Sequence, residues 1–189
     1  MNPDEDEEAR RPIAESCGIY RLHERHVDAL QVLASDAAVA ATTRIPHPYP
    51  ADGARVFFEL MQREREAGTA HVFAIEEDGR FVGLCGFHGI VAGRAELGFW
   101  VGRPFWGRGI GAHAAAAALR VGFDYLRLEQ VWAEALADNV GSRRILERLG
   151  MRRTGERAHG SERWPAAVPL VRYEIDRAGF AGATNGPSG

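Results

Sequence analysis

The chain has 189 residues, a formal net charge of −3 at pH 7 and 46% hydrophobic residues. This length suits one globular domain. The mildly acidic balance argues against nucleic acid as a main partner. There is no apolar run of about 18 residues, which argues against a membrane-spanning chain. We therefore expect a single-domain, cytoplasmic protein.

The two ends of the chain differ in composition from its middle. Residues 1–15 form an acidic segment, and residues 178–189 are small and rich in glycine. Such segments bury too little apolar surface to offset the entropy of ordering, so we expect both to be disordered tails. One domain is expected over residues 16–177.

Hydrophobic periodicity predicts strands and helices in alternation along this domain. An EEDG turn at 76–79 predicts a hairpin, and Gly150 follows the last predicted helix as its cap. In chain order, the predicted elements are strand 17–22, helices 27–34 and 51–67, strands 71–75, 81–90 and 97–101, helix 113–125, strand 130–135, helix 140–149, and strands 152–157 and 170–175. These elements predict an α/β (α+β) fold with a mixed, twisted sheet flanked by helices.

The cysteines and histidines do not have the spacing of a metal site. Cys17 and Cys85 lie in apolar strand patterns and are expected to be reduced core residues. His23 and His26 lack the HExxH order, and we expect them at a solvated edge. No bound metal is predicted.

The glycine-rich segment ELGFWVGRPFWGRGIGA, residues 96–112, predicts a strand that runs into a turn and then a helix. Gly107, Gly109 and Gly111 allow the backbone to approach a ligand closely. The amides and macrodipole at a helix N-terminus favour an anion by up to about 2 kcal/mol. The segment therefore predicts a phosphate site, although a glycine-containing turn with no ligand remains an alternative.

Two common phosphate motifs do not fit this segment. A P-loop has Lys and then Ser or Thr after its last glycine, whereas Ala112 follows Gly111 and the chain contains no lysine. A dinucleotide site has GxGxxG and a second βαβ unit, whereas here the spacing is GxGxG and no second unit follows. Coenzyme A, which carries a pyrophosphate, fits the remaining pattern.

The run WGRGIG, residues 106–111, resembles motif A of the GNAT superfamily of acetyl-CoA-dependent N-acetyltransferases. Trp106 replaces the usual Gln or Arg, which is similar to the RimJ/RimL branch of ribosomal-protein N-terminal acetyltransferases. The preceding AELGFWV and the later NVGSRRILERLGM also resemble that branch. The resemblance covers residues 17–176 and implies a GNAT-like fold, with a mostly antiparallel sheet of about seven strands.

The resemblance implies that acetyl-CoA is bound as cofactor and donor. It also implies that the strand at residues 99–101 separates from its neighbour through a bulge, so that its backbone pairs with pantetheine. The residues to which it assigns coenzyme binding are Phe99, Trp100, Val101, Trp106, Gly107, Arg108, Gly109, Ile110, Gly111, Ala112, Asn139 and Ser142.

Two residues are the catalytic candidates. Glu96 lies where several GNAT enzymes place the glutamate that removes the amine proton, and Glu162 is the reserve. The usual acid is a tyrosine, but Leu146 occupies its position, so the resemblance transfers protonation of the CoA thiolate to Ser142. The alternatives are that Glu96 makes a hydrogen bond within the sheet and that Ser142 bonds local backbone.

The acceptor site is expected in the segment TTRIPHPYP, residues 42–50, which three prolines stiffen. Its Arg44, His47 and Tyr49 are candidates to receive a peptide N-terminus, with Trp164 on the opposite wall. The alternative is a proline-rich connector between helices.

Three functions follow from these motifs. The leading one is acetyl transfer to a protein N-terminal α-amine. The second is acetylation of a small amine such as a polyamine or antibiotic, and the third is a non-catalytic regulator that binds acyl-CoA. Similar proteins are commonly dimers, so the resemblance also makes a homodimer an expectation to test.

Overall fold

The computed structural model describes residues 18–162 and 164–184, which form a seven-stranded sheet in the order β1-β2-β3-β4-β5-β7-β6. Neighbouring strands are antiparallel except β4 and β5, which are parallel. The predicted fold class, a mixed and mostly antiparallel sheet of about seven strands, is confirmed. The strands are β1 Ile19–Arg21, β2 His71–Glu77, β3 Arg80–Val91, β4 Arg94–Val101, β5 Gln130–Leu136, β6 Arg152–Arg157 and β7 Leu170–Asp176.

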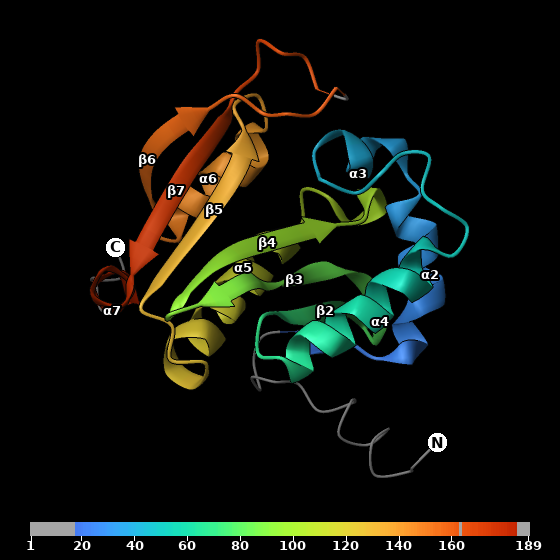
Figure 1. Ribbon diagram of the computed structural model, residues 1–189, viewed down its shortest axis with the longest axis horizontal. Coiled ribbons are helices and arrows are strands. Elements are labelled where there is room, and N and C mark those ends of the chain that lie inside the picture. The colour runs from blue at the N-terminus through green and yellow to red at the C-terminus, as the bar shows by residue number, and fades with distance from the viewer. Residues whose placement is uncertain (1–17, 163, 185–189) are drawn as a thin grey trace.

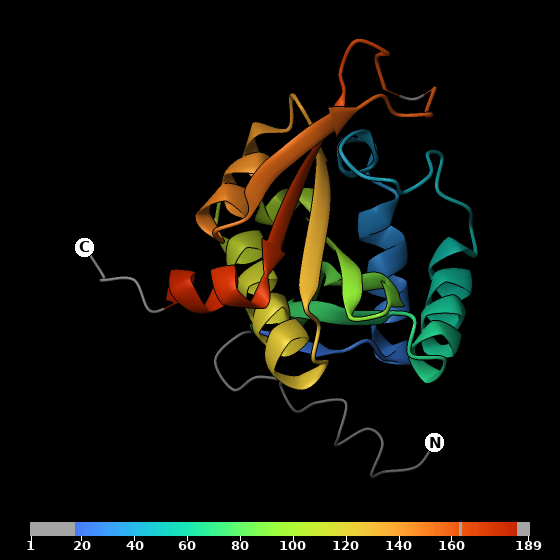
Figure 2. The same ribbon diagram turned by 60° about the vertical axis from the view of Figure 1, so that its left-hand side comes forward.

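Helices cover both faces of the sheet (Figure 1). The helices α2 and α4 lie on one face of the β1–β4 half, and α5 lies on the other face, as the rotated view shows (Figure 2). The helical elements are η1 Glu24–His26, α2 Val27–Ala34, α3 Ala37–Ala41, α4 Gly53–Glu66, η2 Arg103–Phe105, α5 Ile110–Arg120, η3 Val121–Tyr125, α6 Val140–Arg148 and α7 Arg177–Thr184.

The sheet separates two apolar cores. The larger one packs α5 and α6 against the strands and includes Leu119, Leu146 and Tyr173. The smaller one packs α2 and α4 against the opposite face and includes Leu30 and Met61. Alternate residues of each central strand therefore serve different cores, as the period of two in a β-strand requires.

The two halves of the sheet part between β4 and β5. Their pairing joins Arg94 to Gln130, Ala95 to Val131 and Glu96 to Trp132, and it extends no further along either strand. Figure 1 shows the two strands starting together and then diverging. The edge of β4 that faces β5 thus has no strand partner beyond Glu96.

Several elements differ from the sequence expectations. Helix α3 was not predicted because its five residues, 37–41, are too few for a periodic pattern. Residues 178–184 were expected in a disordered tail but belong to helix α7, in which Phe180 stacks on Phe123. The helix expected over 113–125 begins earlier, at Ile110, and ends in a π-helical turn. The predicted tails at 1–15 and 185–189 lie outside the described residues, as does Cys17.

His26 corrects another expectation, because it is buried rather than solvated. Its Nε2 lies 2.8 Å from Oε1 of Glu76, and its Nδ1 accepts a hydrogen bond from the backbone N–H of His23. The contact between His26 and Glu76 joins η1 to β2. Burial lowers the pKa of His26 below its usual value, and the hydrogen bond to Glu76 opposes that shift. Cys85 is buried as predicted, and burial raises the pKa of its thiol.

In the part of the chain that the structure describes, no helix is long and apolar enough to cross a lipid bilayer.

Candidate functional site

A cleft of about 1160 Å³ opens where β4 and β5 diverge. One end is lined by the glycine-rich turn that precedes α5, together with the first turns of α5 and α6. The other end is lined by the α3–α4 segment, residues 42–53, and by Trp164. The cleft therefore reaches from the predicted phosphate site to the predicted acceptor site.

The glycine-rich turn has the geometry expected of an anion site. Gly107 and Gly109 adopt left-handed backbone conformations with φ of 76° and 78°, which side-chain-bearing residues rarely adopt. Gly109 is the N-cap of α5, and no side-chain hydrogen bond caps this helix end. The turn and Ile110, Gly111 and Ala112 line the cleft. The first amides of α5 are thus placed to bind phosphate oxygens.

The free edge of β4 offers backbone groups to the cleft. The N–H of Gly102 donates to the carbonyl of Val82 at 2.8 Å, so the hydrogen bonds to β3 fall on alternate residues. Leu97, Phe99 and Val101 therefore direct their backbone groups toward the β5 side, where no strand pairs with them. Such an edge can pair with an extended chain such as pantetheine.

The predicted bulge at residues 99–101 is wrong. From Glu96 to Val101 the register of β4 against β3 is regular, and the irregularity lies between His88 and Val91. The divergence of β5 frees the edge of β4 instead. Phe99 and Val101 pack toward the α5 core, whereas Trp100 packs toward the α2 and α4 core. All three residues are among those that line the cleft.

Trp106 fastens the glycine-rich turn to β4. Its indole Nε1–H donates to the carbonyl of Val101 at 2.6 Å, although 46% of the residue is exposed. Arg108 was also expected to bind the phosphates of coenzyme A, but its side chain is directed toward Glu77 instead. Its guanidinium lies 2.8 Å from a carboxylate oxygen of Glu77, and the residue is not among those that line the cleft.

The start of α6 forms another wall of the cleft. The side-chain oxygen of Asn139 accepts a hydrogen bond from the N–H of Ser142 at 3.0 Å, which confirms that Asn139 is the helix cap. Both residues line the cleft. Leu146, which stands where many relatives are expected to have tyrosine, is fully buried in the core. No phenol is present at that position, which leaves the hydroxyl of Ser142 nearby.

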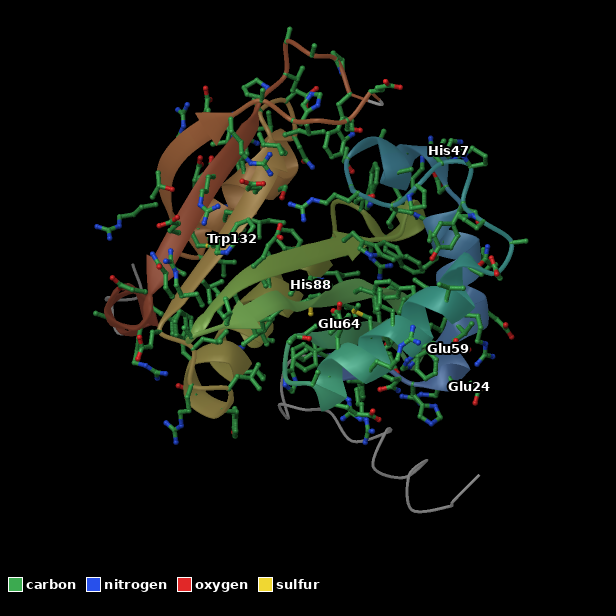
Figure 3. The ribbon with its side chains drawn as sticks, viewed as in Figure 1. Glu24, His47, Glu59, Glu64, His88 and Trp132 are labelled. Carbon is green, nitrogen blue, oxygen red and sulfur yellow. The ribbon has the colours of Figure 1, made fainter. Side chains whose placement is uncertain are left out.

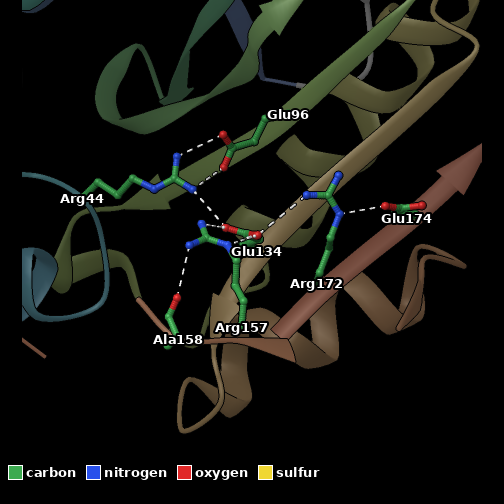
Figure 4. Close-up of polar contacts among 7 residues, drawn as sticks. All are labelled: Arg44, Glu96, Glu134, Arg157, Ala158, Arg172 and Glu174. Atoms are coloured by element: carbon green, nitrogen blue, oxygen red, sulfur yellow. Dashed lines mark hydrogen bonds and ion pairs between the residues drawn. The ribbon is translucent and has the colours of Figure 1, made fainter. Parts of the chain in front are cut away.

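Glu96 is held by Arg44 in a two-pronged contact (Figure 4). One guanidinium nitrogen donates to Oε2 at 3.0 Å, and the other donates to Oε1 at 2.6 Å. The Glu96 side chain is 15% exposed and that of Arg44 is 57% exposed. The hydrogen bond to Glu96 raises the pKa of Arg44, so the guanidinium stays charged. Both carboxylate oxygens of Glu96, the expected base, therefore accept hydrogen bonds from Arg44.

A second carboxylate, Glu134 on β5, lies beside this pair. Its side chain is 1% exposed and accepts hydrogen bonds from Arg157 at 2.8 and 2.5 Å. Arg44 and Arg172 contribute longer contacts of 3.5 and 3.8 Å. A buried carboxylate needs such partners because the desolvation of an unpaired charge is costly. The cluster thus brings together the α3–α4 segment, β4, β5, β6 and β7.

His88 on β3 is the direct partner of Glu96 across the β3–β4 hairpin. The residue is partly buried and lines the cleft. Burial lowers the pKa of His88, and this effect outweighs the opposing charges of Glu96 and Glu64. Its imidazole is therefore neutral at pH 7. Figure 3 shows His88 and Glu64 on the side of the sheet that α4 covers.

The remaining predicted acceptor residues divide into two groups. Tyr49 and Trp164 line the cleft, and the indole N–H of Trp164 donates to the carbonyl of Ala41 at 2.9 Å. His47 is exposed and lies on the outer side of the molecule (Figure 3). Glu162, the reserve base, is exposed as well, and neither residue is among those that line the cleft.

The sequence analysis missed His88, Glu134 and Arg157. The tight turn at Ala92 and Gly93 signals a hairpin close to His88, but the register irregularity between His88 and Val91 decides that His88 pairs with Glu96, so the turn alone does not reveal this pairing. No local signal existed for the other two. They meet only because β6 and β7 fold back beside β5.

The chain is similar to known acetyltransferases in sequence. The family described as "Acetyltransferase (GNAT) domain" matches residues 18–152. The uncharacterized N-acetyltransferase p20 of Bacillus licheniformis is 31% identical over 106 residues, which cover 54% of this chain and 60% of p20. The putative ribosomal N-acetyltransferase YdaF of Bacillus subtilis is 32% identical over 44% of this chain and 46% of YdaF. The matches thus span only about half the length of these relatives.

Solved structures share the fold at low sequence identity. RimJ of Mycobacterium smegmatis in complex with CoA-disulfide superposes with a TM-score of 0.77 at 22% identity, covering 85% of this chain and 81% of RimJ. RimL, a ribosomal L7/L12 α-N-protein acetyltransferase in complex with coenzyme A, has a TM-score of 0.78 at 18% identity, covering 87% and 96%. A spermidine N-acetyltransferase from Vibrio cholerae in complex with CoA and spermine has a TM-score of 0.77 at 15% identity, covering 89% and 99%.

Proposed function

Because this chain belongs to the GNAT acetyltransferase domain family, we propose that it transfers an acetyl group from acetyl-CoA to a primary amine, most favourably the α-amine of a protein N-terminus. The observation that carries the proposal is the single cleft that joins the uncapped N-terminus of α5 to Glu96. A coenzyme phosphate and an acceptor amine can approach the same β4 edge from its two ends.

Acetyl-CoA is a substrate in this proposal, because its acetyl group is consumed in each turnover, and it is not a resident cofactor. The turn at Gly107 and Gly109 and the first amides of α5 hold the pyrophosphate. The backbone groups of Phe99 and the N–H of Val101 pair with the pantetheine arm, while the carbonyl of Val101 accepts the hydrogen bond from Trp106. CoA complexes of RimJ and RimL, which have this fold, support the assignment.

The charge of the acceptor end favours an N-terminal amine over a polyamine. A polycation would need several carboxylates that lack other partners, whereas Glu96 and Glu134 are both paired with arginines, which leaves the exposed Asp52 as the described cleft carboxylate without an ion pair. The wall beside them is largely apolar and includes Tyr49, Phe57 and Leu60. Such a wall suits the side chains of a peptide better than it suits a chain of ammonium groups.

The chemistry requires a neutral amine. Near pH 7, neutralising an α-amine costs about 1 kcal/mol, whereas neutralising a polyamine nitrogen costs about 4.6 kcal/mol. Glu96 promotes removal of that proton, directly or through a neighbouring group, and Ser142 donates to the sulfur as CoA leaves. A mild base is sufficient for the α-amine.

The test is acetyl-CoA turnover, followed by chromatography of CoA, with a panel of N-terminal peptides, polyamines and aminoglycosides at matched concentrations. We expect turnover with peptides and a loss of about 100-fold or more in kcat/KM for Glu96→Gln. Glu162→Gln is the matched control and should keep wild-type activity. Turnover with small amines alone would favour the polyamine or antibiotic reading.

A non-catalytic regulator that binds acyl-CoA is the other alternative, and it is favoured by the buried Leu146, which stands where the family resemblance places an acidic tyrosine. Tight binding of acetyl-CoA without turnover of any acceptor would support this function. Unchanged turnover in both Glu96→Gln and Ser142→Ala would instead remove the two proposed catalytic roles. A cytoplasmic location and a homodimer are part of the proposal, and cell fractionation and sedimentation test them.

A further inference from the structure

A group that accepts a proton in the cleft gives up any ion pair that depends on its negative charge, and Glu96 is already in such a pair. Each of its carboxylate oxygens accepts a hydrogen bond from Arg44, at 3.0 and 2.6 Å. A proton arriving on Glu96 would neutralise the carboxylate and leave the Arg44 charge less well paired. A second acceptor close to Glu96 would avoid that cost.

His88 is placed to be that acceptor. A Cβ atom on Gly98 would lie 3.6 Å from Cδ2 and 3.7 Å from Nε2 of His88. The imidazole therefore packs against β4 at Gly98, where no side chain separates it from the backbone. Among the described residues, no hydrogen bond is made to the His88 ring. The residue lines the same cleft as Glu96 and the free edge of β4.

We propose that His88 accepts the proton that the acceptor amine loses before it attacks the thioester, and that Glu96 stabilises the imidazolium so formed. The inference rests on the proposed acetyltransferase function and assigns a further residue to it. Glu96 then acts through its charge, with its position fixed by Arg44, while the imidazole makes the contact with the amine.

The protons and electron pairs balance in this acetyl transfer. His88 takes one proton from the ammonium form of the acceptor, and the neutral nitrogen forms the C–N bond with the thioester carbon. The C–S bond breaks and its electron pair leaves on sulfur. The second N–H proton ends on that sulfur through Ser142, and His88 returns its proton to water in the cleft. The net products are the amide, CoA thiol and one released proton.

The groups around His88 fit this role. Glu96 on β4 and Glu64 on α4 carry negative charge that favours the imidazolium, and Arg44 from the α3–α4 segment opposes it. Burial lowers the pKa of His88 from 6.5, so the ring is neutral and able to accept at pH 7. A base with a pKa of at most about 6.5 deprotonates an α-amine of pKa 8 with a penalty of roughly 30-fold or more, against nearly 10⁴-fold for a polyamine amine of pKa 10.4. His88 therefore also favours the N-terminal acceptor.

The experiment compares wild-type protein with His88→Gln and with His71→Gln, using whichever amine of the panel the wild-type protein acetylates. His71 is the matched control, because it lies on the neighbouring strand with a pKa also lowered by burial but is not among the residues that line the cleft. We expect His88→Gln to lower kcat/KM by about 100-fold or more and to remove the decline in rate on the acid side that follows the lowered pKa of His88. His71→Gln should keep the wild-type profile.

Two further measurements separate this role from a structural one. Calorimetry should give the same acetyl-CoA Kd for wild-type protein and His88→Gln within about twofold. NMR titration of the wild-type His88 ring should give the pKa that governs the acid side of kcat/KM, which is informative even if the variant folds poorly.

Near wild-type kcat/KM in His88→Gln at every pH, or a His88 pKa that does not match the rate profile, would overturn the proposal and leave the acetyltransferase function intact. Absence of turnover by the wild-type protein with every amine would overturn both. The two failures are therefore distinguishable.

Discussion

At the scale of single residues, two arginines fix the carboxylates at one end of the cleft. Arg44 and Arg157 converge on Glu96 and Glu134, whose side chains are 15% and 1% exposed (Figure 4). The planar guanidinium fork suits such two-pronged contacts better than an ammonium group would. In a chain without lysine, this geometry holds the acceptor end of the cleft in one arrangement.

Trp106 also acts through one hydrogen bond. We expect Trp106→Phe to weaken CoA binding about fivefold, because the ring is kept but the N–H that fastens the glycine-rich turn to Val101 is lost. A hydrogen bond of this kind contributes about 1 kcal/mol. Isothermal titration calorimetry with CoA measures the change. Trp132→Phe is the control, since Trp132 contacts Arg172 rather than the turn, and equal losses in both variants would contradict this role.

At the scale of elements, α6 depends on its first turn. Asn139 is the only described residue whose side chain caps this helix, through the N–H of Ser142. The same turn lines the cleft, so the position of Ser142 and the stability of the helix are linked. The helix is further held to β7 by Arg143, which donates to the hydroxyl of Tyr173 at 3.1 Å.

We expect Asn139→Ala to lower the free energy of unfolding by about 1 kcal/mol, because one amide of α6 loses its acceptor. Urea unfolding followed by circular dichroism measures the change. Asn139→Asp keeps an acceptor oxygen and should recover most of the loss. If Asp138→Ala, at the neighbouring position, costs as much as Asn139→Ala, the cap is not the cause.

At the scale of the whole molecule, three histidines couple stability to pH. Burial is the largest cause of a lowered pKa for His26, His71 and His88, each from a usual value of 6.5. Between the lowered native pKa and 6.5, the unfolded chain therefore binds more protons than the folded one. The contribution of these groups to stability is present above pH 6.5 and is lost as pH falls below it.

We accordingly expect the free energy of unfolding to fall between pH 7.5 and pH 5.5, by at most about 1.4 kcal/mol for each of these histidines. Urea titrations at several pH values measure it. His71→Gln should make the dependence shallower, because one of the three groups no longer titrates. Constant or rising stability toward pH 5.5 would show that burial does not dominate these pKa values.

The sequence by itself determined most of the strands and helices and the glycine-rich turn at one end of the cleft. Periodicity predicted strands 152–157 and 170–175 close to their observed bounds, and the WGRGIG run predicted the turn before α5. These features depend on contacts within a few residues, such as glycine φ angles and helix caps, which local composition controls. Short elements such as α3 were missed because five residues carry too little pattern.

Only the tertiary structure decided the acceptor end of the cleft. It showed that β4 is freed by the divergence of β5 rather than by a bulge, that His47 and Arg108 lie apart from the cleft, and that His88 stands opposite Glu96. Glu134 acquires Arg157 and Arg172 from strands that follow it in the sequence by 18 or more residues, and Arg44 from the segment between α3 and α4. Such contacts depend on strand order and on the angle between strands, which the packing of the two cores sets and no short stretch of sequence encodes.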